Sequence, residues 1–280
     1  MRADCHMHMV LDGYNWKSAI ARHENAPEEA FIRDALARYR DLGYTYLRDG
    51  GDRWGVGAKA RALAPEYGIT YRTPLAPLCK AGHYGSFIGT VFENVSDFSR
   101  LVVKTRENGG DFIKIMISGL MDFHNFGVLT EEGLPAAEIA QLIHIAKAEG
   151  MSVMVHANGA DTVIAAAEAG VDSVEHGAYL DKNALEAMEA FGVVWVPTLS
   201  TVGNLLGKGR FPDDQVAKIL DSALQNVADF AAMGGLLAAG TDAGAWSVPH
   251  GCATEEAHFA KAGVGEEILS CGLAVIQEKF

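Results

Sequence analysis

Residues 3–10, ADCHMHMV, form a mostly apolar run that is typical of a buried β-strand. Seven further runs of this kind follow it, and longer segments with helical periodicity separate them. The eight predicted strands are residues 3–10, 44–50, 69–78, 111–118, 152–158, 172–178, 193–200 and 236–244. Alternation of strands and helices along a whole chain is typical of βα units built around a parallel sheet.

The predicted helices lie at 26–43, 96–109, 135–150, 161–170, 182–192, 212–234, 254–263 and 266–277. Several begin near Pro, Ser or Asp and end at Gly, as helix caps require. Eight βα units predict an α/β fold of the (β/α)₈ TIM-barrel type, with residues 1–280 as one domain. A doubly wound sheet is the competing fold. It would normally carry a glycine-rich phosphate loop after the first strand, and DCHMHMVLDG (4–13) is not one.

The composition argues against several classes of partner. The net charge is -13 and no cluster of Lys or Arg overrides it, so nucleic acid is not an expected partner. The four cysteines form no CxxC pair, and we find neither a leader segment nor an apolar run long enough to cross a bilayer. We therefore expect a cytoplasmic protein without a membrane partner.

The first predicted strand places two histidines on one face. Residues two apart in a strand point to the same side, so His6 and His8 present a chelating pair of imidazoles. A single buried histidine is more often a core residue with a satisfied hydrogen bond. Two of them in one apolar strand favour a metal site, because burial of unpartnered imidazoles costs several kcal/mol.

Three further ligand-type residues lie near the ends of later predicted strands. They are His156, His176 and Asp242. A barrel places its active site at the carboxyl ends of its strands, and packing alone is a poor explanation for five such residues at one rim. The pattern therefore predicts a metal centre.

Lys114 lies in an apolar run, DFIKIMIS (111–118), where a charged ammonium is costly. One interpretation is a lysine that extends to the rim or pairs with a carboxylate. The other is an amine that has taken up carbon dioxide as a carbamate, whose two oxygens can bridge two cations. The sequence leaves both interpretations open.

These motifs together resemble one known superfamily. HMH (6–8), IKI (113–115), VHANG (155–159), EHG (175–177) and GTDAG (240–244), in this order, are similar to the metal-dependent amidohydrolase superfamily. YTYLRDGG (44–51), AGHYG (81–85), WVPTLS (195–200) and PHG (249–251) resemble the branch with prolidase-like Xaa-Pro dipeptidases, arginine carboxypeptidases and imidazolonepropionases. The resemblance covers nearly the whole chain.

The resemblance implies a binuclear metal centre with a bridging hydroxide. Its implied ligands are His6, His8 and Asp242 for one metal, His156 and His176 for the second, and carbamylated Lys114 as the bridge. Asp242 would be the general acid and base. These donors favour two Zn²⁺ ions, although manganese, iron and cobalt are compatible.

Members of this branch usually carry a small β-sandwich, built from segments before the first strand and after the last helix. Residues 1–280 contain neither segment. Because the sandwich lies outside the barrel, we expect the metal site to be independent of it. The surface that it would cover must be polar or buried by a partner, so a homo-oligomer stays open.

Weaker expectations concern residues around the centre. His83, Tyr84 and His250 lie on predicted loops and are candidate contacts to a small-molecule substrate. Arg48 and Asp49 are interpreted as a structural pair beneath the site.

The predicted function is hydrolysis of a C–N bond in an amide, a lactam or a peptide-like substrate. By resemblance, a small dipeptide or an N-acyl amino acid comes first. Three alternatives stay open: a mononuclear deaminase of the same superfamily, a phosphoester or lactone hydrolase, and a non-catalytic metal-binding barrel.

Overall fold

The computed structural model describes residues 2–280 and shows an α/β fold with two parallel sheets. The first sheet has the order β1 (Arg2–Met7), β2 (Tyr44–Asp49) and β3 (Thr70–Arg72). The second has the order β10-β9-β8-β7-β6-β4-β5, formed by β4 (Leu78–Lys80), β5 (Thr90–Phe92), β6 (Ile113–Met116), β7 (Val153–Ala157), β8 (Ser173–His176), β9 (Val194–Val196) and β10 (Leu236–Leu237).

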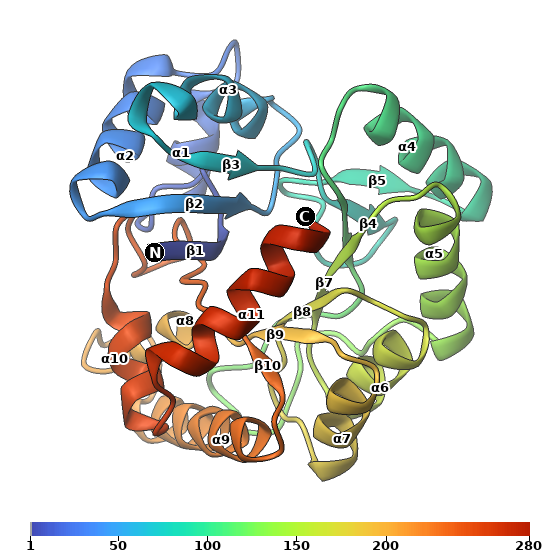
Figure 1. The fold of residues 1–280 in the computed structure, drawn as a ribbon, viewed down its shortest axis with the longest axis vertical. Coiled ribbons are helices and arrows are strands. Elements are labelled where there is room, and N and C mark those ends of the chain that lie inside the picture. The colour runs from blue at the N-terminus through green and yellow to red at the C-terminus, as the bar shows by residue number, and fades with distance from the viewer. Residues whose placement is uncertain (1) are drawn as a thin grey trace.

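Backbone hydrogen bonds connect the two sheets in two places. On one side, Cys5 N donates to Ala239 O over 2.8 Å, so β1 lies beside the segment that follows β10. On the other, Asp111 N donates to Thr73 O over 2.9 Å, so the end of β3 lies beside the residues that precede β6. In Figure 1 most helices lie around the outside of the strands, and α11 crosses in front of them.

Each of the eight predicted strand regions contains a strand, and one prediction needs correction. The run 69–78 is divided between β3, which ends at Arg72, and β4, which begins at Leu78. Pro74 and Pro77 lie between them, and a proline has no N–H to donate to a sheet. The sequence analysis did not predict β5.

Twelve helical segments are described. They are α1 (Trp16–Arg22), α2 (Glu29–Asp41), α3 (Val56–Leu63), the 3₁₀ helix η1 (Ala64–Tyr67), α4 (Val95–Glu107), α5 (Ala136–Ala148), α6 (Ala160–Glu168), α7 (Lys182–Ala190), α8 (Ser200–Gly203), α9 (Asp213–Ala232), α10 (Thr254–Lys261) and α11 (Glu266–Lys279). The eight predicted helices are confirmed, whereas α1, α3, η1 and α8 were not predicted. In α2 the buried residues Ile32, Ala35, Leu36 and Tyr39 follow the helical period and form the face that packs on the strands.

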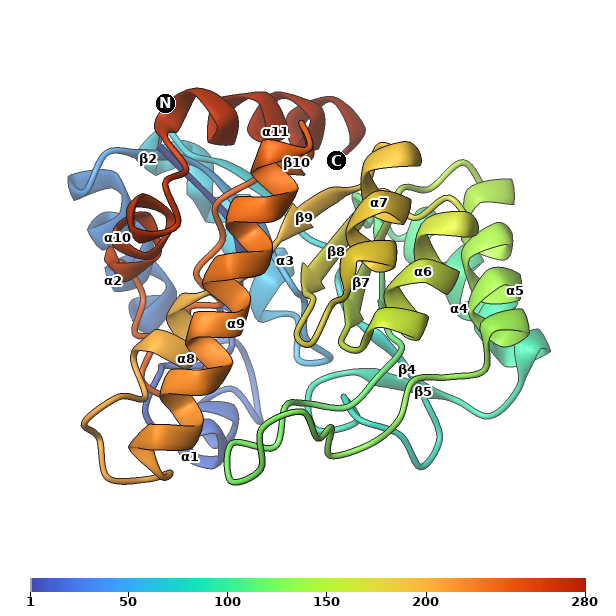
Figure 2. The ribbon, with the colours of Figure 1, turned by 90° about the horizontal axis from the view of Figure 1, so that it is seen from below.

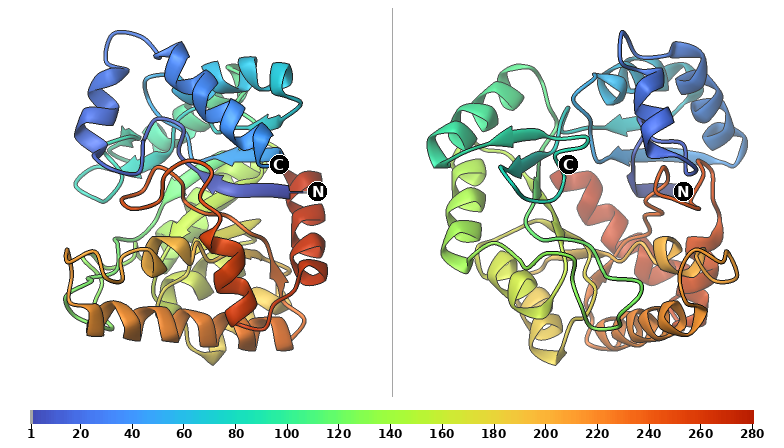
Figure 3. Two further views of the ribbon diagram at one scale, coloured as in Figure 1. Left: turned by 90° about the vertical axis from the view of Figure 1, so that its left-hand side faces the viewer. Right: turned by 180° about the vertical axis from the view of Figure 1, so that it is seen from behind.

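Helix α11 covers one end of the strands, and the long loops lie at the opposite end (Figure 2). Ile276 and the C-terminal Phe280 belong to a buried cluster with Phe112 of the interior. The rings of Phe112 and Phe280 meet edge to face, with their centroids 5.1 Å apart. Apolar side chains therefore fill this end, and the loops seen from behind in Figure 3 surround the other end. Within residues 2–280, no helix is long and apolar enough to span a membrane.

Candidate active site

The first group of ligand-type side chains lies at the end of β1 and in the segment that follows β10. The Nε2 atoms of His6 and His8 lie 3.3 Å apart. Asp242 Oδ1 is 3.5 Å from His6 Nε2 and 3.4 Å from His8 Nε2. Asp242 N donates to His6 O over 2.7 Å, and this backbone hydrogen bond holds the carboxylate beside the imidazoles. The donor atoms of these three residues lie within 4.8 Å of one another, close enough to hold one metal ion.

His156 and His176 form the second group, next to the first. Their ring centroids are 4.5 Å apart, and the ring of His176 is 5.0 Å from that of His6. His176 Nδ1 lies 2.7 Å from Thr198 Oγ1, while His156 Nε2 lies 3.1 Å from Gly119 O. Strands β7 and β8 are adjacent, which explains why these histidines meet.

Three residues of the site have left-handed backbone conformations. The φ angles are 70° for His176, 50° for Thr198 and 56° for Asp242. Residues other than glycine rarely adopt positive φ, and such strain persists where the surrounding structure fixes the chain. These strained residues lie near the carboxyl ends of the strands, which agrees with a functional site at this end of the fold.

Lys114 is buried beside these groups and has no hydrogen-bond partner for its Nζ atom. Burial lowers the pKa of its ammonium to about 8, and the nearby Glu175 opposes this effect. Lys114 is only 1% exposed, and a buried ammonium without a hydrogen-bond or ion-pair partner is energetically costly. The sequence-based interpretation of a lysine paired with a carboxylate therefore has no counterpart among the described contacts of Lys114.

The histidines of the site favour their neutral forms. Burial, followed by the charge of Lys114, lowers the pKa of His8 and of His156 to about 3. Neutral imidazole is the form that binds metal ions. Burial raises the pKa of Asp242 to about 8, and a bound cation reverses this preference because it stabilises the carboxylate. The donor set therefore fits a divalent cation.

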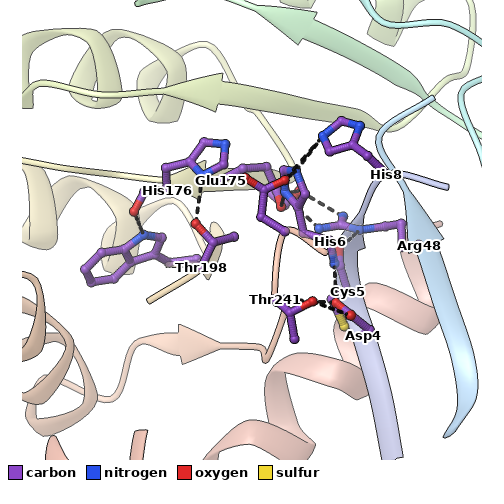
Figure 4. Close-up of polar contacts among 12 residues, drawn as sticks. Asp4, Cys5, His6, His8, Arg48, Glu175, His176, Thr198 and Thr241 are labelled. Carbon is purple, nitrogen blue, oxygen red and sulfur yellow. Dashed lines mark hydrogen bonds and ion pairs between the residues drawn. The ribbon is translucent and has the colours of Figure 1, made fainter. Parts of the chain in front are cut away.

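A buried ion pair supports the first histidine (Figure 4). Glu175 Oε2 accepts a hydrogen bond from His6 Nδ1 over 2.6 Å, and Arg48 Nη2 donates to Glu175 Oε1 over 2.8 Å. The Arg48 and Glu175 side chains are fully buried. Because Glu175 keeps the proton on Nδ1, it leaves the Nε2 lone pair of His6 free for a metal.

The sequence analysis did not identify this role of Glu175, and its expected pairing of Arg48 with Asp49 is wrong. Neighbouring residues of a strand point to opposite faces. Asp49 instead accepts hydrogen bonds from Thr73 Oγ1 over 3.1 Å and from Met9 N over 3.3 Å. The available signal was an acid directly before His176 in a buried strand.

Asp4 anchors the segment that carries Asp242. Its carboxylate accepts hydrogen bonds from Thr241 N over 2.9 Å and from Thr241 Oγ1 over 2.6 Å. This pair ties the start of β1 to the residue before Asp242 (Figure 4). The first ligand group therefore depends on contacts between the two ends of the chain.

A cavity of about 930 Å³ opens above the site and is lined by all six candidate ligands. Tyr84 also lines it, with its ring centroid 4.9 Å from that of His156. Among the described residues, the lining does not include His83 or His250. His83 pairs with Glu131, and the buried His250 donates from Nε2 to Leu11 O over 2.9 Å. The structure thus brings the six candidate ligands and Tyr84 together and places His83 and His250 elsewhere.

Known proteins resemble the chain in sequence and in fold. Ochratoxinase from Aspergillus niger is 26% identical over 293 residues, which cover 92% of this chain and 59% of the relative. The chain thus spans less than two thirds of that relative's length. No protein-family model matches the chain.

Two solved structures show the same fold. A Xaa-Pro dipeptidase with bound methionine superposes with a TM-score of 0.77 at 22% identity and covers 99% of this chain, which spans 75% of the dipeptidase. The crystal structure of A. niger ochratoxinase gives a TM-score of 0.77 at 22% identity, over 99% of this chain and 69% of the ochratoxinase chain. The motifs, the α/β fold and these similarities together support the chain's resemblance to the amidohydrolase superfamily and to its prolidase-like branch.

Proposed function

We propose that the chain is a metal-dependent hydrolase that cleaves the C–N bond of an amide, a lactam or a peptide-like substrate. The observation that carries the proposal is the convergence of four neutral imidazoles, a carboxylate and an unpartnered amine at the base of one cavity. We also propose that the two sheets form a single (β/α)₈ barrel, which the two backbone hydrogen bonds between the sheets support.

The residues present fit two divalent cations. His6, His8 and Asp242 would hold one cation, and His156 and His176 the other, with Zn²⁺ as the preferred ion for this donor set. When bound, the cations would lower the pKa of a water molecule and polarise the scissile carbonyl. The chain's contribution is to fix the donors, to which the contact between Glu175 and His6 contributes, and to keep the imidazoles neutral through burial.

Asp242 is the proposed general acid and base. Its carboxylate lines the cavity, and its Oδ1 lies 3.5 Å from His6 Nε2 and 3.4 Å from His8 Nε2. In this position it can accept a proton from the attacking water and return it to the leaving nitrogen. The backbone hydrogen bond from Asp242 N to His6 O keeps the carboxylate in place during both transfers.

Lys114 is proposed to carry a carbamate. The uncharged amine attacks carbon dioxide, a C–N bond forms, and one proton leaves to solvent. The product is an anion with two oxygens among neighbouring imidazoles, which removes the cost of an unpartnered buried ammonium. Its oxygens would then serve as the bridge between the two cations.

Metal analysis of purified protein tests this proposal. We expect about two metal ions per chain for the wild type expressed with zinc and bicarbonate. Lys114→Ala should retain one ion or none. Lys80→Ala is the matched control. Lys80 Nζ lies 2.7 Å from Glu138 Oε2, and Lys80 is not among the residues that line the cavity. One ion in both the wild type and Lys114→Ala would contradict the bridge and favour the mononuclear deaminase.

Substrate assays then decide the reaction. The metal-loaded wild type should release amines from a panel of N-acyl amino acids and dipeptides, and Asp242→Asn should lose this activity by about two orders of magnitude or more. Turnover of phosphoesters or lactones alone would replace the proposed reaction with one of the alternatives. A metal-loaded protein without turnover on the whole panel would contradict an enzymatic function.

A further inference from the structure

Asn158 directly follows β7, the strand that lies between β6 and β8 in the sheet. It is fully buried and lines the cavity. Its Nδ2 atom donates to Gly119 O over 2.9 Å, in the segment after β6. Its Oδ1 atom accepts from Ala178 N over 2.9 Å, in the segment after β8. One side chain thus joins the segments that follow three adjacent strands.

The two backbone partners fix the orientation of the Asn158 amide. A backbone N–H group can only donate a hydrogen bond, and a carbonyl oxygen can only accept one. The reversed amide would place Nδ2 against Ala178 N and Oδ1 against Gly119 O, so both hydrogen bonds would be lost. The nitrogen of Asn158 therefore faces the carbonyl of Gly119.

The same carbonyl determines which ring nitrogen of His156 carries the proton. His156 Nε2 lies 3.1 Å from Gly119 O, and this nitrogen must be the donor because the carbonyl can only accept. Burial lowers the pKa of His156 to about 3, so the ring is neutral and its lone pair is on Nδ1. A metal ion binds that lone pair. The position of Gly119 O thus selects the tautomer of His156.

Asn158 acts on this carbonyl by a second route. Ser118 Oγ donates to Gly119 O over 3.1 Å, and the same hydroxyl accepts from Asn158 N over 2.8 Å. The backbone of Asn158 therefore orients a further donor to the carbonyl that its side chain already holds. Both routes end at the acceptor of His156 Nε2.

The ligands of the first cation depend on different contacts. His6 is oriented by Glu175 over 2.6 Å, and Asp4 accepts hydrogen bonds from the residue before Asp242. None of the described hydrogen bonds of Asn158 reaches these four residues. Loss of the Asn158 amide should therefore affect the two proposed cations unequally.

We propose that Asn158 is a positioning residue that acts through Gly119 O and holds His156 in the tautomer that binds the second cation. Asn158 thereby decides whether the chain takes up one cation or two. The inference rests on the proposed binuclear centre. It gives Asn158 a role in metal uptake and not in contact with the substrate, although the residue lines the cavity.

Nitrogen-15 NMR of the metal-free protein reads the tautomer without any metal or turnover. The protonated and unprotonated nitrogens of a neutral imidazole have separate resonances, and the signals that disappear in His156→Gln belong to His156. We expect the proton on Nε2 in the wild type and a mixture of both tautomers in Asn158→Ala. A proton on Nδ1 in the wild type, or an unchanged tautomer in Asn158→Ala, would overturn the proposal.

Zinc titration against a chromophoric chelator, with bicarbonate present, measures the two affinities. In Asn158→Ala the second ion should bind about 10- to 100-fold more weakly, while the affinity for the first stays within about threefold of the wild type. In a His156→Gln background, Asn158→Ala should have no further effect, because the ring that it positions is absent. Equal weakening of both ions would indicate a general loss of packing and would overturn the proposal.

Asn226→Ala is the matched control. Asn226 Nδ2 donates to Leu180 O over 3.0 Å, so this amide also holds the segment after β8, but it has no described contact with His156 or Gly119. Both zinc affinities should stay at the wild-type values. A selective loss of the second ion in Asn226→Ala would show that any loosening of this segment suffices, which contradicts the specific role of Asn158.

Ser118→Ala keeps the test decisive if Asn158→Ala does not fold. It removes one donor to Gly119 O and leaves the Asn158 side chain in place. The second zinc ion should then bind about three- to tenfold more weakly, as the loss of one neutral hydrogen bond provides. An unchanged second affinity in Ser118→Ala would overturn the proposal.

Turnover separates this inference from the proposed function. With both zinc sites filled, Asn158→Ala should regain the wild-type KM for an N-acyl amino acid, whereas a raised KM would identify a substrate contact and overturn the proposal. A selective loss of the second ion in Asn158→Ala, together with no amide turnover by the wild type, would refute the proposed function and leave this inference standing. Amide turnover by a wild type that binds one zinc ion would do the reverse.

Discussion

Glu175 contacts both the buried Arg48 and His6 of the proposed metal site, so its replacement by glutamine should change both the stability of the fold and the affinity for metal. The glutamine keeps one oxygen and replaces the other with an NH₂ group. That group must face either His6 Nδ1 or Arg48, and both of these are donors in the wild type. The substitution thus creates one buried clash between donors and leaves the Arg48 guanidinium without a counter-ion.

The size of the effect follows from burial. Both side chains of the ion pair have no exposed surface, and removal of one partner of a buried pair costs about 3–5 kcal/mol. Arg48 keeps its hydrogen bonds to Cys5 O and Ser173 Oγ, so we expect about 3 kcal/mol for Glu175→Gln. Loss of the partner that orients His6 should also weaken metal binding by about 10- to 100-fold.

The assays are urea unfolding of metal-free protein and metal competition with a chelator. Arg48→Met should lower the unfolding free energy but keep most of the metal affinity, because the Glu175 contact to His6 persists. The double variant should show a coupling of about 1–3 kcal/mol relative to the single variants. Glu186→Gln is the control, since Glu186 forms an exposed pair with Lys182 and should change stability by less than about 0.5 kcal/mol. Wild-type metal affinity in Glu175→Gln, or additive single effects, would refute the reasoning.

Two further predictions concern residues next to the candidate ligands, and a third concerns the buried Glu255 of α10, whose oxygens accept hydrogen bonds from Leu199 N and Ser200 N. Thr198→Val removes the hydroxyl that contacts His176 Nδ1 and should lower affinity for one metal by about 10-fold, as measured by metal titration; unchanged affinity would contradict it. Gly50→Ala introduces a Cβ that would lie 2.2 Å from Cε1 of the His8 ring, so the variant should lose metal while its circular dichroism stays native; full metal content would show that His8 is not a ligand. Burial raises the pKa of Glu255 in the folded protein to about 8. The stability that this group contributes is therefore fully present below the pKa that it has in the unfolded chain, and it is lost as the pH rises toward 8. Between pH 5 and pH 8 the wild type should therefore lose more unfolding free energy in urea than Glu255→Gln, and parallel pH profiles would contradict the assignment.

The sequence determined the type and order of most elements and the candidate ligands. Apolar runs with the strand period and capped helical segments are local signals, and they depend little on the rest of the chain. His6, His8, His156, His176 and Asp242 were identifiable because each follows or ends such a run. Where a parallel fold has many βα units, the ends of these runs meet at one end of the strands, and in the structure these residues lie close together.

The tertiary structure decided which residues support the site and which do not reach it. Arg48 and Glu175 are 127 positions apart, and Asp4 and Thr241 are 237 apart, so no local pattern could pair them. The burial of His250 is equally non-local. A hydrogen bond depends on the distance between two atoms within a few tenths of an ångström, and only the packed chain sets that distance.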